Sequence, residues 1–313
     1  MLSFIGSLNI NLIDFMFINF SLLIVFAGAL INFLEPHLPL FITQSFRYGK
    51  HESKGEKNEF IRLLEVPKAW FKHFYVFALG WSVFALYLTI KGIILKSSAP
   101  DFVLDALDFL GGSSQRVVLL SSHETLIVLT LLTLQCVRRF YETNFVQIFS
   151  SKSKINVSHY LVGYLHYFGA IVAVLLNAEG FVRGTHGHSF SFRNLKVAQV
   201  ICCMIFHMCW REQYKSNMIF VDLRKDKAGK QVTEEHRIPT GRLFNLVTSP
   251  HYLFEILIYV VIFFIIPQSS SWRYCTLWVI SNQVENAWLT HKWYKETFKN
   301  YPKSRKAIIP FVF

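Results

Sequence analysis

Acidic residues are scarce in this chain. Its 313 residues include 20 Asp and Glu, and charged residues of both signs make up 17% of the total. Soluble domains contain about 25% charged residues. Hydrophobic residues make up 52% of the chain, which has 31 phenylalanines. This composition excludes a disordered chain and argues against an ordinary water-soluble enzyme.

Several widespread motifs are missing as well. The sequence contains no GxGxxG, GxxxxGK[ST], GxSxG or HExxH pattern, which excludes the usual nucleotide-loop, lipase-type and zinc-peptidase classes. The five cysteines all lie within or at the edges of apolar runs and have no metal-ligand spacing. His186 and His188 share a glycine-containing stretch, where a turn is favoured because no third ligand is near. No metal site is therefore predicted.

Long hydrophobic runs are the main feature of the sequence. Their approximate bounds are 11–34, 70–95, 117–137, 157–178, 195–214, 250–267 and 271–290. Each is close to the roughly 20 residues that a helix needs to cross a bilayer. The first run has neither a basic leader nor a small-residue cleavage site, so we expect it to be a retained helix. The sequence thus predicts an all-α, polytopic membrane protein with seven transmembrane helices in a single domain, residues 1–313.

Basic residues are distributed unevenly between these runs. Alternate connecting segments hold 23 Lys and Arg in one set and four in the other. The basic set comprises 35–69, 138–156, 215–249 and 291–313, and the other set comprises 96–116, 179–194 and 268–270. The positive-inside rule then places the N-terminus in the lumen and the C-terminus in the cytosol. The net charge of +12 comes without a basic helix or a recognisable nucleic-acid module, so no nucleic-acid partner is expected.

Polar residues interrupt three of the apolar runs, and in the 117–137 run they are His123 and Glu124. The last run contains Asn282, Gln283, Glu285 and Asn286, and the preceding run contains Glu255. Polar groups are costly in the bilayer interior, so we expect these side chains to face a protein interior or a water-filled cavity. For Glu255 and Glu285, this cost indicates a specific partner or a functional role.

Several segments carry a more specific signal. They are RYGK at 47–50, VPK--F-HFY at 66–75, LRK-KAG at 223–229, HRIP-G--F--V-SP-YL-E-LIYV at 236–260 and YPK-RKA--PF-F at 301–313. The last segment mixes basic and large apolar residues around two prolines, so we expect it to dock onto the bundle. At these residues, and from about position 45 to the C-terminus, the chain resembles the steroid 5α-reductase family. RYGK and VPK resemble the branch of that family that reduces polyprenal.

The resemblance implies an NADPH-dependent oxidoreductase of the endoplasmic reticulum membrane that acts on CH–CH groups. In the polyprenal branch the substrate is a long-chain isoprenoid aldehyde. Its α,β double bond is reduced to give dolichal, which feeds the lipid carrier for protein N-glycosylation. The alternatives are a 3-oxo-5α-steroid 4-dehydrogenase or another membrane enone or sterol reductase, an isoprenylcysteine methyltransferase, a transporter and a seven-helix receptor. Dependence on NADPH or on S-adenosylmethionine separates the reductase from the methyltransferase.

The resemblance also implies site residues. The positions for contact with cofactor phosphate and ribose are Arg139, Gln213, Asn217, Arg224, Arg237, Tyr294 and Arg305. His291 and Tyr294 are three residues apart and share one helical face. We expect Tyr294 to contact the nicotinamide region and His291 to lie near the reacting head group. A histidine that only packs and an arginine that only anchors a helix end are the alternatives for such positions.

The group that polarises the substrate carbonyl does not follow from the resemblance. The steroid-reducing relatives use a Glu and Tyr pair, and those positions align with Phe60, beside Glu59, and with Cys136. Hydride transfer to the β-carbon places charge on the carbonyl oxygen, so a donor is needed there. Glu59, His291, Tyr294 and a backbone amide remain as candidates.

Overall fold

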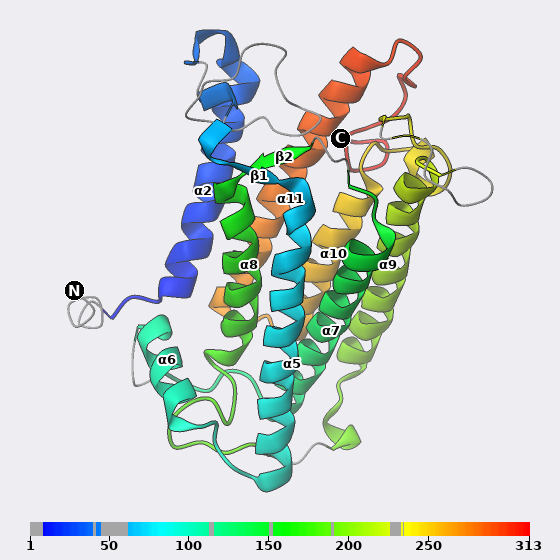
Figure 1. Cartoon of the computed structure of the whole chain (residues 1–313). Helices are drawn as coiled ribbons and strands as arrows, with labels where there is room; N and C mark the ends of the chain where they lie inside the picture. Colours follow the sequence, from blue (N-terminus) through cyan, green and yellow to red (C-terminus); the bar gives the residue numbers. More distant parts are fainter. Residues whose placement is uncertain are drawn as a thin grey trace.

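The structure is a computed structural model that describes residues 9–39, 42–44, 62–112, 116–149, 153–188, 191–225, 233 and 235–313. Glu59, Phe60 and the RYGK segment lie outside the described residues. The chain is mostly helical, and its long helices lie side by side in one bundle (Figure 1).

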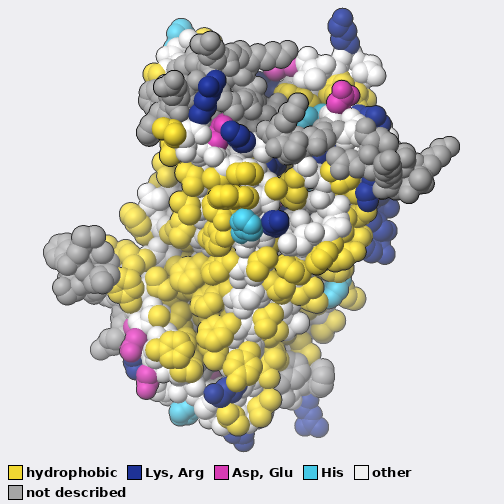
Figure 2. Space-filling model, in the orientation of Figure 1, with side chains coloured by type: hydrophobic (Ala, Val, Ile, Leu, Met, Phe, Trp, Pro, Cys, Tyr) yellow, Lys and Arg dark blue, Asp and Glu magenta, His cyan; other side chains and the backbone are white. Residues whose placement is uncertain are grey.

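A helix occupies each predicted apolar run. The long helices are α2 (Leu12–Phe33), α5 (Phe71–Leu95), α7 (Ser122–Tyr141), α8 (Val157–Leu175), α9 (Val197–Asp222), α10 (Pro250–Ile265) and α11 (Ser270–Thr297). Among the described residues, three helical segments are long and apolar enough to cross a membrane, namely Leu12–Phe33, Lys68–Leu95 and Val157–Leu175. Hydrophobic side chains cover the middle of the visible face, and most Lys and Arg lie toward its two ends (Figure 2).

Short elements connect the long helices. The strands β1 (Glu65–Pro67) and β2 (Lys154–Asn156) pair antiparallel, with Val66 opposite Ile155. The single-turn elements are η1 (Glu35–His37), η3 (Lys68–Trp70), η4 (Glu142–Val146, a π-helix), η5 (Phe192–Asn194) and η6 (Arg242–Asn245). The all-α prediction is therefore correct for the bundle but omits this two-stranded sheet, whose strands are too short to give a sequence pattern.

The connection between α5 and α7 contains a further helix, α6 (Asp101–Gly111). Its 11 residues are too few to cross a bilayer. Val103, Leu104 and Leu107 are buried on one face, and the chain leaves the helix through Gly112 at φ 81°. This spacing of apolar residues is helical, which explains why the connection is not an irregular loop.

The core lies around the second half of α8, which ends at Leu175. Residues 169–175 of α8 are all buried. Beside them, the rings of Tyr259 and Trp272 stack with centroids 5.5 Å apart and planes at 4°. The other half of α8 is less buried, so the bundle is filled at one end and leaves room for a cavity toward the other.

The C-terminal segment docks onto the bundle, as its mixed composition indicated. The Thr248 amide donates to the Lys306 carbonyl at 2.8 Å, and the Ser249 amide donates to the Ala307 carbonyl at 3.2 Å. Ala307 and Ile308 are buried. The tail thereby closes over the loop between α9 and α10 and helps to position its residues.

Candidate functional site

A cavity of about 1110 Å³ opens within the bundle, and we call it the central cavity. It is lined by residues of α2, α5, α7, α8, α9, α10 and α11 and of the loops near the C-terminal end of α11. Pockets for drug-sized ligands measure about 300–1,000 Å³, so this cavity has room for a larger ligand or for two.

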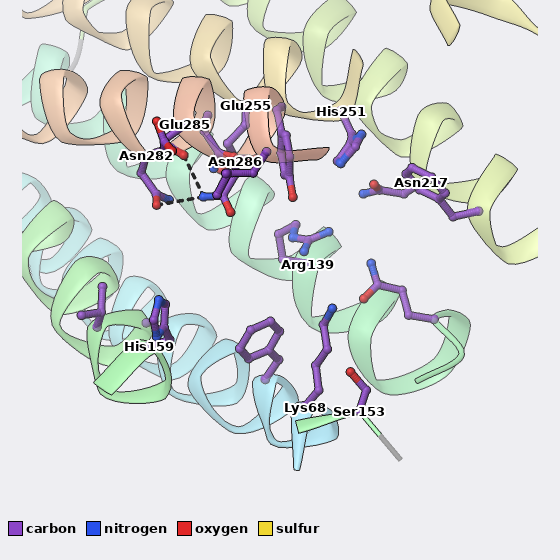
Figure 3. A pocket seen from close by; sticks show the side chains of 18 of the residues that line it. Lys68, Arg139, Ser153, His159, Asn217, His251, Glu255, Asn282, Glu285 and Asn286 are labelled. Carbon is purple, nitrogen blue, oxygen red and sulfur yellow. Dashed lines mark hydrogen bonds between the residues drawn. The ribbon is translucent and has the colours of Figure 1, made fainter. Parts of the chain in front are cut away.

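One part of the central cavity is basic, and we call it the basic part. It is lined by Lys68, Arg139, Arg224 and Arg237 together with the amides of Gln213 and Asn217. Side chains of Lys68, Arg139, Asn217 and His251 converge on a common space in the close-up view (Figure 3). Such a set of cations and amide donors matches an anionic ligand with several oxygen acceptors.

The other part is apolar, and we call it the apolar part. It is lined by Phe20, Leu23, Ile24 and Ala27 of α2, Val162 and Gly163 of α8, and Trp278 and Val279 of α11. Leu23 lines the cavity although 63% of its surface is exposed. The apolar part therefore reaches the outer surface of the bundle along α2, where hydrocarbon would contact it.

Arg139 is held rigidly in the basic part. Its Nη2 and Nε atoms donate to the Tyr75 hydroxyl at 2.8 and 3.2 Å, and its guanidinium forms an ion pair with Glu142. Glu142 is 1% exposed and begins the π-helix after α7. Asn217 of α9 donates to the same carboxylate at 3.0 Å. Arg139 and Asn217 are thus positioned by one shared acidic residue.

Gln213 belongs to a second polar network. Its side-chain nitrogen donates to Glu255 and, at 3.2 Å, to the His251 carbonyl. Gln135 also donates to Glu255 at 3.2 Å, and Arg138 donates to Gln135 at 2.8 Å. Glu255 therefore has the specific partners that its position in an apolar run indicated, and the network joins α7, α9 and α10.

Tyr294 of α11 and Arg224, which lies just after α9, both line the central cavity. Arg224 donates to the Ile148 carbonyl, while the Tyr294 hydroxyl donates to the Arg237 carbonyl at 3.3 Å. The Tyr294 ring is stacked on that of Tyr301, with centroids 5.5 Å apart. Among the described residues, the structure thus gathers Arg139, Gln213, Asn217, Arg224, Arg237 and Tyr294 around the central cavity.

His291 and Arg305 do not belong to the described lining. His291 Nδ1 lies 2.6 Å from the Thr248 hydroxyl, which lies 2.6 Å from the Tyr301 hydroxyl. Arg305 donates to the Pro239 carbonyl at 2.9 Å. Both side chains are buried, Arg305 within the docked tail and His291 beneath it, so sharing a helical face with Tyr294 does not bring His291 to the cavity wall. Glu59 lies outside the described residues.

Sequence reasoning did not select several lining residues as site residues. Asn282, Gln283, Glu285 and Asn286 do line the cavity, which confirms that these polar residues face the interior. The sequence feature that marked these four residues was their position within an apolar run. Lys68 had a weaker signal as the last residue of the VPK motif. The lining residues of α2 had none, because a run that is apolar throughout does not reveal which side faces a cavity.

The bundle and its two-part cavity define a multi-pass helical membrane protein. The family model for 3-oxo-5-alpha-steroid 4-dehydrogenase matches residues 154–313. A polyprenal reductase of Drosophila melanogaster is 52% identical over 306 residues, covering 97% of this chain and 94% of that protein. Polyprenal reductases of Caenorhabditis elegans and Homo sapiens are 33% and 32% identical, covering 88% and 85% of this chain and 89% and 84% of theirs. The chain belongs to the steroid 5α-reductase family.

Proposed function

We propose that this protein reduces the α,β double bond of polyprenal to give dolichal, with NADPH as cofactor. The observation that carries the proposal is the central cavity, which combines a basic part with an apolar part that reaches the bundle surface. A soluble anionic cofactor and a lipid aldehyde need these two environments. The curated relatives that bear the name polyprenal reductase support the same substrate.

The residues of the basic part fit the chemistry of a dinucleotide phosphate. Arg139, Arg224, Arg237 and Lys68 would hold its phosphate groups, and Gln213 and Asn217 would donate to ribose or phosphate oxygens. Tyr294 lines the cavity beside them, and its ring is held by stacking against those of Phe298 and Tyr301. When bound, NADPH supplies the hydride that is added to the β-carbon of the enal.

His291 and Arg305 act in this proposal as positioning residues. They hold the tail and the 236–250 loop in place through Thr248, Tyr301 and the Pro239 carbonyl. Arg237 and Tyr294 then keep their places on the cavity wall.

The proposed placement is a seven-span protein of the endoplasmic reticulum membrane, with a lumenal N-terminus and a cytosolic C-terminus. The distribution of Lys and Arg supports this orientation. The basic part of the cavity would then open toward the cytosol, where NADPH is dissolved, and the isoprenoid tail would remain in the bilayer. The product would serve the lipid carrier of protein N-glycosylation.

The proposal is tested with the full-length protein in lipid nanodiscs. We expect NADPH oxidation with polyprenal, a product heavier by two hydrogen atoms, and a lower rate with a steroid enone. A higher rate with the steroid would favour the 3-oxo-5α-steroid 4-dehydrogenase reaction instead. Absence of NADPH oxidation with either substrate would contradict the reductase proposal.

A further inference from the structure

The middle of α11 presents a polar cluster to the central cavity. Asn282, Glu285 and Asn286 all line it, within a segment that is otherwise largely apolar. Glu285 accepts a hydrogen bond from Asn32 of α2 at 2.9 Å. A Cβ atom on Gly28 would lie 2.6 Å from the Glu285 carboxylate, so the glycine leaves room for this contact. Glu285 is thus committed to the junction of α2 and α11.

The oxygen and the nitrogen of the Asn282 side-chain amide differ in their hydrogen bonds. The Asn286 side-chain nitrogen donates to the Asn282 carbonyl at 2.7 Å and to its Oδ1 at 3.1 Å. That bond fixes the orientation of the Asn282 amide, with Oδ1 used as an acceptor. No hydrogen bond from Asn282 Nδ2 is found among the described residues. The side chain projects from α11 toward the side of the cavity on which His159 of α8 lies (Figure 3).

Asn282 also stands at the boundary between the two parts of the cavity. Trp278 and Val279 of the apolar part lie about one helical turn before it on α11. Tyr294, beside the basic part, lies 12 residues after it, which is about 18 Å along a helix. A lipid whose tail fills the apolar part would bring its polar head to this boundary. The head of polyprenal has one polar atom, the aldehyde oxygen, which is an acceptor.

We propose that Asn282 Nδ2 donates a hydrogen bond to the carbonyl oxygen of the enal substrate. This inference rests on the proposed function. Addition of a hydride to the β-carbon shifts the electron pair of the double bond toward the carbonyl oxygen, and a proton added to the α-carbon then restores the carbonyl. The oxygen is most negative between these steps. A fixed donor therefore stabilises it more strongly than it stabilises the neutral aldehyde, which lowers the barrier.

Asn286 has the role of a positioning residue. Its bond to Oδ1 turns the Asn282 nitrogen toward the cavity and limits the rotation of the amide. Pre-orientation of this kind removes the cost of ordering a donor at the moment of reaction. Loss of the Asn286 side chain should therefore weaken the effect of Asn282 without removing the donor.

The test uses the full-length protein in nanodiscs and the variant Asn282→Asp, which keeps the shape of the side chain and removes the Nδ2 donor. We expect kcat with polyprenal to fall by about 100-fold or more, as for other oxyanion-hole donors. The dissociation constant for NADPH should stay within about twofold. Asn177→Asp is the matched control, because Asn177 contacts the Val117 carbonyl away from the cavity, and its kcat should equal that of the unaltered protein.

A binding measurement separates this role from a structural one. The carboxylic acid analogue of polyprenal carries negative charge where the oxygen of the reacting enal would carry it. The unaltered protein should bind this acid more tightly than the corresponding alcohol, and the neutral variant Asn282→Leu, which has no donor, should lose that preference. Asn282→Ser, which keeps a donor, and Asn286→Ala should show intermediate kcat values.

Three results would overturn the inference. The first is a full kcat in Asn282→Asp, and the second is an unchanged preference for the acid in Asn282→Leu. The third is a loss of NADPH affinity that parallels the loss of kcat, which would place Asn282 against the cofactor. Failure of the proposed function is distinguishable, since the unaltered protein would then not oxidise NADPH with polyprenal.

Discussion

The basic and apolar parts of the central cavity are built from different regions of the chain. The basic part takes its charged side chains from the beginning of η3, the end of α7 and the segments around the end of α9. The apolar part takes its side chains from the middle of α2, α8 and α11. The basic part is fixed by polar networks through Glu142 and Glu255, and the apolar part mainly by helix packing, with the Asn32–Glu285 hydrogen bond joining α2 to α11. A cavity of this kind lets a water-soluble ligand and a lipid approach from different directions and meet at the polar cluster of α11.

The largest effect is expected from removing charge in the basic part. Arg139→Ala should weaken NADPH binding by about 100-fold, because it removes a positioned guanidinium and leaves Glu142 with one cation fewer. Arg139→Lys should recover part of the affinity. Titration of NADPH followed by fluorescence checks this.

Arg211→Ala is the control for that substitution. Arg211 is exposed on α9 and lies 3.5 Å from Glu212, so its removal should leave NADPH affinity unchanged. Equal losses in Arg139→Ala and Arg211→Ala would show that the basic part does not bind the cofactor through specific residues.

A larger side chain in the apolar part should weaken the binding of polyprenal and not that of NADPH. Ala27→Phe should raise KM for long-chain polyprenal by about 10-fold, since the added ring occupies space that the isoprenoid tail would use. NADPH affinity should not change. Steady-state kinetics with a long and a short enal check this, because the short substrate should be affected less. A parallel loss for both chain lengths would contradict a tail site along α2.

The docked tail should affect stability more than binding. Thr248→Val removes the hydroxyl that lies between His291 and Tyr301, and it leaves their polar groups without this partner. The free energy of unfolding should fall by about 1–3 kcal/mol. Thermal unfolding in detergent measures it, with Thr130→Val as an exposed control. Equal melting temperatures for the two variants would contradict the role of Thr248.

The smallest effect is expected far from the cavity. Arg183 forms ion pairs with Asp105 and Asp108 beside α6, and it is 40% exposed. Hydrogen bonding to Asp108 is the main cause that raises the pKa of Arg183 above its usual value. Arg183→Gln should leave the melting temperature and kcat nearly unchanged, because exposed ion pairs contribute little. A large loss of activity would contradict this expectation, because it would show that this end of the bundle influences the site.

The sequence was sufficient for the helices and for much of the basic part, for physical reasons. A run of about 20 apolar residues has few folded alternatives, and the bounds of α2 and α5 differ from the predicted runs by one residue at most. Arg224 and Arg237 could be selected from the sequence because each lies in a distinctive motif. The place of His291 was not predictable, since the helical period brings it near Tyr294 but does not reveal that the docked tail covers it. The apolar part was not predictable either, because its lining residues resemble lipid-facing ones.

The most direct test of the two-part cavity is photo-crosslinking with a polyprenal analogue that carries a diazirine on its isoprenoid tail, in the presence of NADP⁺. The account predicts adducts on Phe20, Leu23 or Ala27 of α2 and on Trp278 or Val279 of α11, suppressed by excess polyprenal. Adducts confined to outward-facing residues such as Phe26 and Phe33, and insensitive to polyprenal, would contradict it.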